Sequence, residues 1–98
     1  MKSVTPQEFF ALDGAALIDV REPDELRVVR TEQARPLPMS SLQDHLDELP
    51  DGPIYVLCHS GGRSARVTAF LEQQGYDAIN VTGGIQEWEA AGLPVVKG

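Results

Sequence analysis

The 98-residue sequence is poor in residues that form disulfides or bind metals, because it contains a single cysteine, Cys58, and only two histidines. One cysteine cannot form an internal disulfide, a Cys-x-x-Cys redox pair or a multi-cysteine zinc site. We therefore expect no bound metal and no cofactor. Any chemistry at Cys58 has to involve its sulfur alone or together with a partner molecule.

Long apolar runs are also missing from the sequence. The longest one, residues 54–58, is far shorter than the ~20 residues that a membrane-spanning helix needs. The first residues of the chain contain no apolar stretch of the length found in signal peptides. The sequence thus predicts a protein that does not bind to or cross a membrane, and a cytoplasmic location.

Basic residues are scarce relative to acidic ones: 8 Lys and Arg against 15 Asp and Glu give a net charge of −7. A field of this sign repels nucleic acid and anionic membrane surfaces, so we expect neither as a partner. It also repels small anions at a distance. A site for an anionic substrate would therefore have to be locally basic.

The arrangement of apolar residues predicts a fold of the α/β class. Ninety-eight residues, 42% of them hydrophobic, allow one domain (residues 1–98) with one core. Short apolar runs alternate with segments that carry helix start signals, as in a parallel sheet with crossover helices. Strands are expected at residues 16–20, 54–58 and 78–81, with a short or edge strand in the proline-containing segment 34–39. Helices are expected after capping boxes at residues 5–8 and 40–43, after Glu22, over residues 64–74 and after residue 84.

Cys58 ends the clearest of these strands, at the sheet edge where open parallel sheets bind ligands. The residues that follow it are His59, Ser60, Gly61, Gly62, Arg63 and Ser64. Two adjacent glycines let this loop turn so that its amides converge on one centre. Amides and a helix N-terminus favour a thiolate, so we expect a lowered pKa and a nucleophilic Cys58. The alternative is an inert buried cysteine, which needs neither glycines nor a helix start after it.

Several charged residues accompany this loop. His59, Arg63 and Arg66 form a basic cluster in an otherwise acidic chain, as an anionic substrate requires. We expect Arg63 to bind the anion, with a surface ion pair as the alternative. His59 either steers anions or lies solvated at the rim. Asp19 and Arg21, at the end of the neighbouring strand, are interpreted as supporting residues that brace one another and influence the position of the loop.

Three segments in order resemble the motifs of a known family. These are residues 17–22 (Leu-Ile-Asp-Val-Arg-Glu), the Cys-x-x-Gly-x-Arg-Ser loop at residues 58–64, and Gly83-Gly84-Ile85-Gln86-Glu87-Trp88 near the end. Over nearly its whole length the chain resembles the single-domain thiosulfate sulfurtransferases of the rhodanese type. One segment departs from the pattern: residues 30–35 replace the family's Gly-His-Ile-Pro-Gly-Ala. The resemblance therefore does not predict the geometry of this segment or of any pocket wall that it forms.

The resemblance implies a five-stranded parallel sheet in the order 1-5-4-2-3, flanked by helices, and a catalytic cysteine at Cys58. It also implies an enzyme that takes sulfane sulfur from thiosulfate or a persulfide, holds it as a persulfide on Cys58, and passes it to a thiol or cyanide. A protein is a further candidate acceptor. Residues 59–64 would then bind the substrate.

Two other functions stay open. A cysteine phosphatase or arsenate reductase also holds a thiolate in a loop of amides, but its loop has the spacing Cys-x5-Arg, whereas Cys58 and Arg63 are separated by four residues. A smaller loop suits one sulfur atom better than a tetrahedral oxyanion. The second alternative is a rhodanese-like module that binds a partner or relays sulfur without catalytic turnover.

Overall fold

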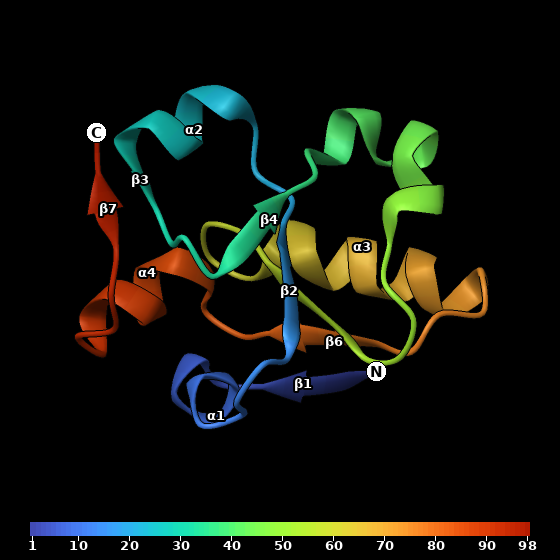
Figure 1. Cartoon of the computed structure of the whole chain (residues 1–98), viewed down its shortest axis with the longest axis horizontal. Helices are drawn as coiled ribbons and strands as arrows, with labels where there is room; N and C mark the ends of the chain where they lie inside the picture. The colour runs from blue at the N-terminus through green and yellow to red at the C-terminus, as the bar shows by residue number, and fades with distance from the viewer.

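The protein contains a five-stranded parallel sheet (Figure 1), here described from a computed structural model that covers residues 1–98. The strands are β1 (Lys2–Val4), β2 (Ala16–Asp19), β4 (Ala34–Pro36), β5 (Ile54–Leu57) and β6 (Ala78–Val81). Their order across the sheet is β1-β6-β5-β2-β4. Counted among themselves, the five strands follow the order 1-5-4-2-3, so the predicted class and topology are confirmed.

Helices cover both faces of this sheet. They are α1 (Pro6–Phe10), α2 (Pro23–Val28), the 3-10 helix η1 (Met39–Glu48), α3 (Gly62–Gln73) and α4 (Gly84–Ala90). Figure 1 shows α3 lying across one side of the sheet, with α1 and α4 on the other. No helix is long and apolar enough to cross a bilayer.

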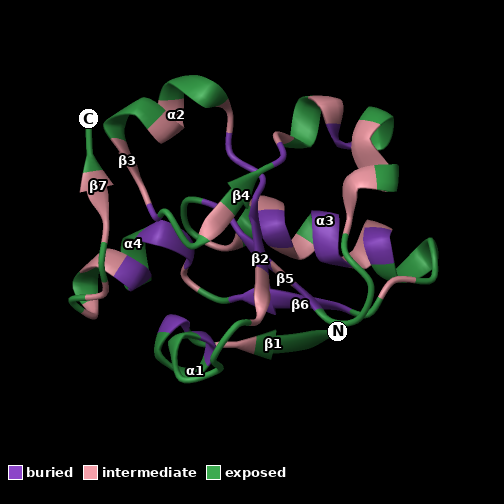
Figure 2. Cartoon of the chain, in the orientation of Figure 1, coloured by how far each residue is buried: buried purple, intermediate pink, exposed green.

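The two faces of the sheet bury two separate apolar clusters, which account for most of the purple segments in Figure 2. The cluster under α3 and η1 contains Ile18, Val20, Leu37, Leu42, Ile54, Val56, Cys58, Val67, Leu71 and Ala78. The cluster under α1 and α4 contains Phe9, Leu17, Leu57, Val81, Ile85 and Trp88. Because side chains alternate along a strand, Val56 of β5 and Cys58 directly after it lie in the first cluster, and Leu57 between them lies in the second.

The first helix begins where its capping box predicts. The Thr5 hydroxyl accepts a hydrogen bond from the Glu8 amide (3.1 Å), and the Glu8 carboxylate accepts one from the Thr5 amide (2.8 Å). These two bonds satisfy amides that the helix itself cannot. The helix ends at Phe10, and Leu12 lies beyond its end with 42% of its surface exposed.

The capping box predicted at residues 40–43 is wrong. Helix η1 begins earlier, at Met39, and is a 3-10 helix with a kink at His45, where φ is −126°. The Ser40 hydroxyl does not cap η1, because it donates to the Glu22 carboxylate at the start of α2 (2.7 Å). A contact between two segments distant in sequence has replaced the local one.

A second, small sheet was not predicted. Strand β3 (Val29–Arg30) pairs antiparallel with β7 (Val96–Lys97). Strand β3 ends at Arg30, the first residue of the segment 30–35 that departs from the family pattern. The segment then turns at the buried Thr31 and continues into β4, where it lines a cavity of about 250 Å³ together with Asp19.

Candidate active site

Cys58 lies directly after β5, at the carboxyl edge of the sheet and on the face covered by α3. Its side chain is 1% exposed and belongs to the apolar cluster that includes Val56 and Val67. The strand ends at Leu57, and the chain then turns through residues 58–61 into α3. Burial by itself would favour a neutral thiol.

Hydrogen bonds to the sulfur oppose this effect of burial. The Gly61 amide donates to Sγ at 3.0 Å, and the Ser64 hydroxyl lies 3.3 Å from Sγ. Burial raises the pKa of the Cys58 thiol, but the Ser64 hydroxyl and the backbone amides of Ser64, Gly61 and Ser60 together outweigh it. The net pKa is lower than that of an ordinary cysteine, in the direction that the sequence predicts.

The start of α4 explains why the loop amides face the sulfur. The Ile85 amide donates to the Cys58 carbonyl (2.8 Å), and the Gln86 amide donates to the His59 carbonyl (3.1 Å). In a trans peptide the C=O and the N–H point in opposite directions. Fixing the His59 carbonyl against α4 therefore turns the Ser60 amide toward Cys58. This role of α4 was missed in the sequence.

Two glycines make this arrangement possible. Gly61 has φ of +101° and stands at the N-cap of α3, a conformation that disfavours any side chain. Gly84 has φ of +59°, and a Cβ there would lie 2.4 Å from the Cys58 carbonyl oxygen. Gly62 has no positive φ and open space around it. The turn thus requires one of the two loop glycines, whereas the sequence suggested both.

Ser64 connects the sulfur to the centre of the sheet. Its side-chain oxygen also lies 3.1 Å from the Gly61 carbonyl and hydrogen bonds to the Asn80 side chain on β6. Ser64 is fully buried and Asn80 is 7% exposed. Asn80 was missed in the sequence, where a polar residue at a central strand position was the only available signal.

Arg63 adopts the arrangement that we considered as the alternative. Its two terminal nitrogens lie 2.6 Å from the two carboxylate oxygens of Glu25 on α2, which makes a bidentate pair. The hydrogen bond with Arg63 lowers the pKa of Glu25 to about 2. The Glu25 carboxylate therefore partly neutralises the basic cluster that the sequence predicts next to Cys58.

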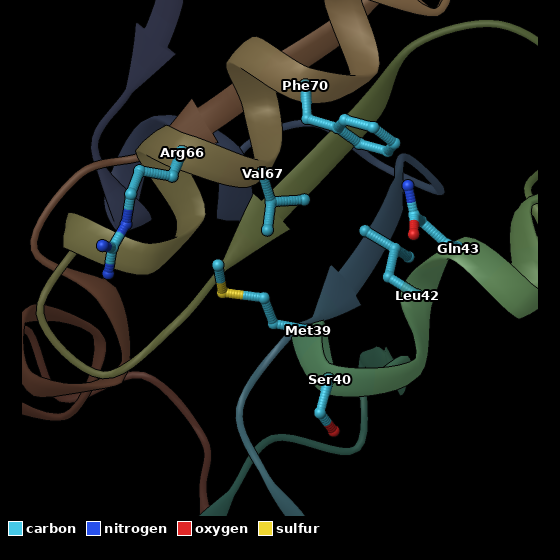
Figure 3. A pocket seen from close by; sticks show the side chains of 7 residues that line it. All are labelled: Met39, Ser40, Leu42, Gln43, Arg66, Val67 and Phe70. Atoms are coloured by element: carbon cyan, nitrogen blue, oxygen red, sulfur yellow. The ribbon is translucent and has the colours of Figure 1, made fainter.

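The other two members of the basic cluster, His59 and Arg66, are exposed. Arg66 lines a cavity of about 260 Å³ between η1 and α3 (Figure 3). The cavity is bounded by Met39, Ser40, Leu42, Gln43, Arg66, Val67 and Phe70. In Figure 3, Met39 reaches from η1 toward Val67, and Arg66 extends from α3 on the side away from Phe70. The cavity thus combines apolar walls with one cation.

Asp19 and Arg21 brace one another, as interpreted from the sequence. Arg21 Nε and Nη2 lie 3.0 and 2.8 Å from the Asp19 carboxylate oxygens, and both residues are 1% exposed. Arg21 also donates to the Val29 carbonyl (2.8 Å). Val20 packs in the apolar cluster that contains Cys58. Because successive side chains point to opposite faces of a sheet, the Asp19 carboxylate lies on the other face. The pair anchors the end of α2, the helix that carries Glu25, so its link to the Cys58 loop is indirect.

Comparison with known proteins identifies the family. The sequence pattern of the Rhodanese-like domain family matches residues 6–91. The chain belongs to the rhodanese family. Two relatives of similar length match most of the chain. A sulfurtransferase of Allochromatium vinosum is 39% identical over an alignment of 86 residues, which covers 86% of this chain and 80% of that protein. Thiosulfate sulfurtransferase GlpE of Actinobacillus succinogenes is 34% identical over 97 residues, covering 94% and 87% of the two chains.

Solved rhodanese structures share the fold. A rhodanese-related protein of Thermoplasma volcanium superposes with a TM-score of 0.91 at 34% identity, over 98% of both chains. A rhodanese-like domain protein of Staphylococcus aureus superposes with a TM-score of 0.85 at 33% identity, over 90% of this chain and 91% of that one.

No group of three or more His, Cys, Asp or Glu side chains in the protein is placed to hold a metal ion.

Proposed function

We propose that this rhodanese transfers sulfane sulfur from thiosulfate or an organic persulfide to a thiol or cyanide through a persulfide on Cys58. The observation that carries the proposal is the environment of the Cys58 sulfur, which is buried and accepts a hydrogen bond at 3.0 Å from the Gly61 amide of the loop after β5. A lowered pKa of the Cys58 thiol adds support, since the thiolate is the nucleophile. One relative of nearly equal length is named a thiosulfate sulfurtransferase.

In the first step the Cys58 thiolate attacks the outer sulfur of thiosulfate. A bond forms between Sγ and this sulfur, the sulfur–sulfur bond of thiosulfate breaks, and sulfite leaves with the electron pair. The outer sulfur keeps the negative charge that it carries in thiosulfate, and the charge of the attacking thiolate is balanced by the electron pair that leaves with sulfite. No external oxidant or reductant is needed, because the attacking thiolate and the departing sulfite balance the electrons.

In the second step the acceptor attacks the outer sulfur of the persulfide. A new bond forms to the acceptor, the bond to Sγ breaks, and Cys58 leaves as a thiolate. A thiolate acceptor becomes a persulfide, and cyanide becomes thiocyanate. Hydrogen bonds that stabilise the Cys58 thiolate serve both steps, because this thiolate is the nucleophile of the first and the leaving group of the second.

The remaining loop residues would bind the substrate. The amides of Ser60, Gly61 and Ser64 stabilise negative charge at the sulfur. Arg63 would meet the anionic end of the donor only if it leaves Glu25, whereas the exposed Arg66 is available at the rim of the neighbouring cavity. Both a small thiol and a protein thiol are compatible with these contacts as the physiological acceptor, and a cytoplasmic location remains a prediction.

Intact mass spectrometry tests the proposal directly. The protein is mixed with thiosulfate, the excess is removed, and the mass is measured before and after addition of cyanide. We expect a gain of one sulfur atom that cyanide removes. Because Cys58 is the only cysteine, the Cys58→Ser variant should show no gain.

The same experiment separates the alternatives. Failure of the wild-type protein to take up sulfur from thiosulfate and from an organic persulfide would reject the enzyme and favour a binding module. Uptake without release to any small acceptor would favour a relay to a protein partner. Hydrolysis of an aryl phosphate that depends on Cys58 would identify a phosphatase.

A further inference from the structure

The Ser64 hydroxyl has more partners than it can serve with one hydrogen. Its oxygen is close to Cys58 Sγ (3.3 Å), to the Gly61 carbonyl (3.1 Å) and to the Asn80 side-chain oxygen. A hydroxyl donates once and accepts twice. With a neutral thiol these partners are compatible: the thiol donates to Ser64, and Ser64 donates to one of the two carbonyl oxygens.

Ionisation of Cys58 makes this arrangement of hydrogen bonds impossible. A thiolate can only accept, so the Ser64 hydrogen has to turn toward the sulfur. The Asn80 oxygen then has no hydrogen bond from Ser64, whereas the Gly61 carbonyl keeps the one from the Ala65 amide (3.1 Å). Ser64 is fully buried and Asn80 is 7% exposed, so bulk water cannot freely replace the lost bond.

Asn80 is the one neighbour of the hydroxyl that can change its role. The Gly61 carbonyl is only an acceptor, but an amide side chain carries an acceptor oxygen and a donor nitrogen of nearly the same shape. Rotation of the Asn80 amide by half a turn would present its NH2 group to the Ser64 oxygen. Ser64 would then accept from Asn80 and donate to Cys58 at the same time.

We propose that Asn80 is a positioning residue, which directs the Ser64 hydroxyl toward the Cys58 sulfur whenever this sulfur is negatively charged. Asn80 does not touch the sulfur and acts only through Ser64. The inference rests on the proposed function in that the charged sulfur is the nucleophile and leaving group of sulfur transfer. Its physical content, control of the thiolate by Asn80, can be measured without a sulfur donor.

The charged side chains near Cys58 are engaged with other partners, so neutral donors stabilise the thiolate. Arg63 on α3 interacts with the thiolate, but its guanidinium is held by Glu25 of α2 and is also close to Glu22. The Asp19–Arg21 pair at the end of β2 lies on the other face of the sheet. A change at Asn80 therefore acts on Cys58 mainly through the hydrogen-bond chain, except where it introduces a new charge.

The test measures the rate of Cys58 alkylation by iodoacetamide from acidic to alkaline pH, which yields the pKa of the thiol. Asn80→Leu removes both the donor and the acceptor, and Asn80→Asp keeps the shape but can only accept. We expect both variants to raise the pKa of Cys58. Alkylation at acidic pH should slow about tenfold for every pH unit by which this pKa rises. The larger rise is expected for Asn80→Asp, because its charge also repels the thiolate.

A double-mutant cycle with Ser64→Ala separates positioning from a general structural effect. Without the Ser64 hydroxyl, Asn80→Leu should leave the alkylation profile where Ser64→Ala alone places it. Thr68→Val is the matched control, since Thr68 is another fully buried hydroxyl on α3 that bonds to the Ser64 carbonyl (2.7 Å) and not to its side chain. This control should keep the wild-type profile.

Two results would overturn the inference: an unchanged pKa in both Asn80 variants, or an equal rise in pKa with and without the Ser64 hydroxyl. If Asn80→Leu does not fold, the nearly isosteric Asn80→Asp still tests the inference. An unchanged alkylation profile in this variant would reject the hydrogen-bond connection from Asn80 through Ser64 to Cys58. Failure of wild-type sulfur uptake is a different outcome. It rejects the proposed function and leaves the alkylation test valid.

Discussion

Two buried polar sites lie at the carboxyl ends of the neighbouring strands β2 and β5, and they solve the problem of burial in opposite ways. The Asp19–Arg21 site joins two full charges in a bidentate pair with further bonds to backbone carbonyls. The Cys58 site surrounds one ionisable sulfur with the Ser64 hydroxyl and backbone amides. The pair lies on one face of the sheet and the sulfur on the other.

The two ways of compensating a buried charge suit the two sites to different roles. A charge that is matched by an opposite charge has little reason to react, and its removal leaves the partner charge buried. A sulfur stabilised by neutral donors keeps its own negative charge available for attack. We therefore expect changes in the Asp19–Arg21 site to act on stability and changes in the Cys58 site to act on reactivity.

The largest effect on stability is expected at Asp19. Asp19→Ala leaves the Arg21 guanidinium buried without its partner, so the free energy of unfolding should fall by about 3–5 kcal/mol. Urea denaturation measures this, with the exposed Asp24→Ala as control. A loss at Asp19 no larger than that of the control would remove the basis of the comparison.

Gly84→Ala should affect both stability and reactivity, because α4 orients the Cys58 loop. The new Cβ would collide with the Cys58 carbonyl 2.4 Å away, and φ of +59° strains any side chain. We expect a loss of about 2–4 kcal/mol in urea unfolding, together with a higher pKa of Cys58 by alkylation. Gly62→Ala, with open space and no positive φ, is the control for stability and should cost little. Equal losses in the two variants would contradict the role assigned to α4.

A smaller effect is expected from pH, because the pKa of Cys58 is lower in the folded protein than that of an ordinary thiol. Ionisation then stabilises the fold fully above the unfolded pKa of about 8.5, and this contribution is lost as the pH falls through the folded pKa. The stability of the wild type relative to Cys58→Ala should therefore rise from acidic to alkaline pH. Urea unfolding across this range measures it, and a flat difference would mean that the thiol is not perturbed.

The smallest effect is expected at the partly exposed Glu25–Arg63 pair. Glu25→Gln should cost about 0.2–1 kcal/mol in unfolding free energy near neutral pH. The difference from the wild type should disappear as the pH falls toward about 2, the pKa of Glu25 in the folded protein. In thiosulfate kinetics the released Arg63 should lower KM, whereas an unchanged KM would indicate that Arg63 serves only the ion pair.

Local signals account for the parts of the fold that were predicted well. The apolar runs at Ala16–Asp19, Ile54–Leu57 and Ala78–Val81 form strands within one residue of their expected limits, and Thr5 caps α1 through Glu8. The strand order came from the family resemblance, since apolar periodicity does not specify neighbours in a sheet. Helix η1 was predicted less well, because the partner of Ser40 is Glu22, far away in the sequence.

Strands β2, β5 and β6, the start of α1 and the candidate nucleophile Cys58 were predictable from the sequence, because apolar runs, caps and a glycine-rich loop after a strand act through neighbours along the chain. Which groups face Cys58 depends on the three-dimensional fold. Arg63 turns to Glu25, the start of α4 orients the loop amides, and Asn80 meets Ser64. These contacts join segments far apart in the chain, and a hydrogen bond or ion pair depends on distances of a few ångströms that only folding sets.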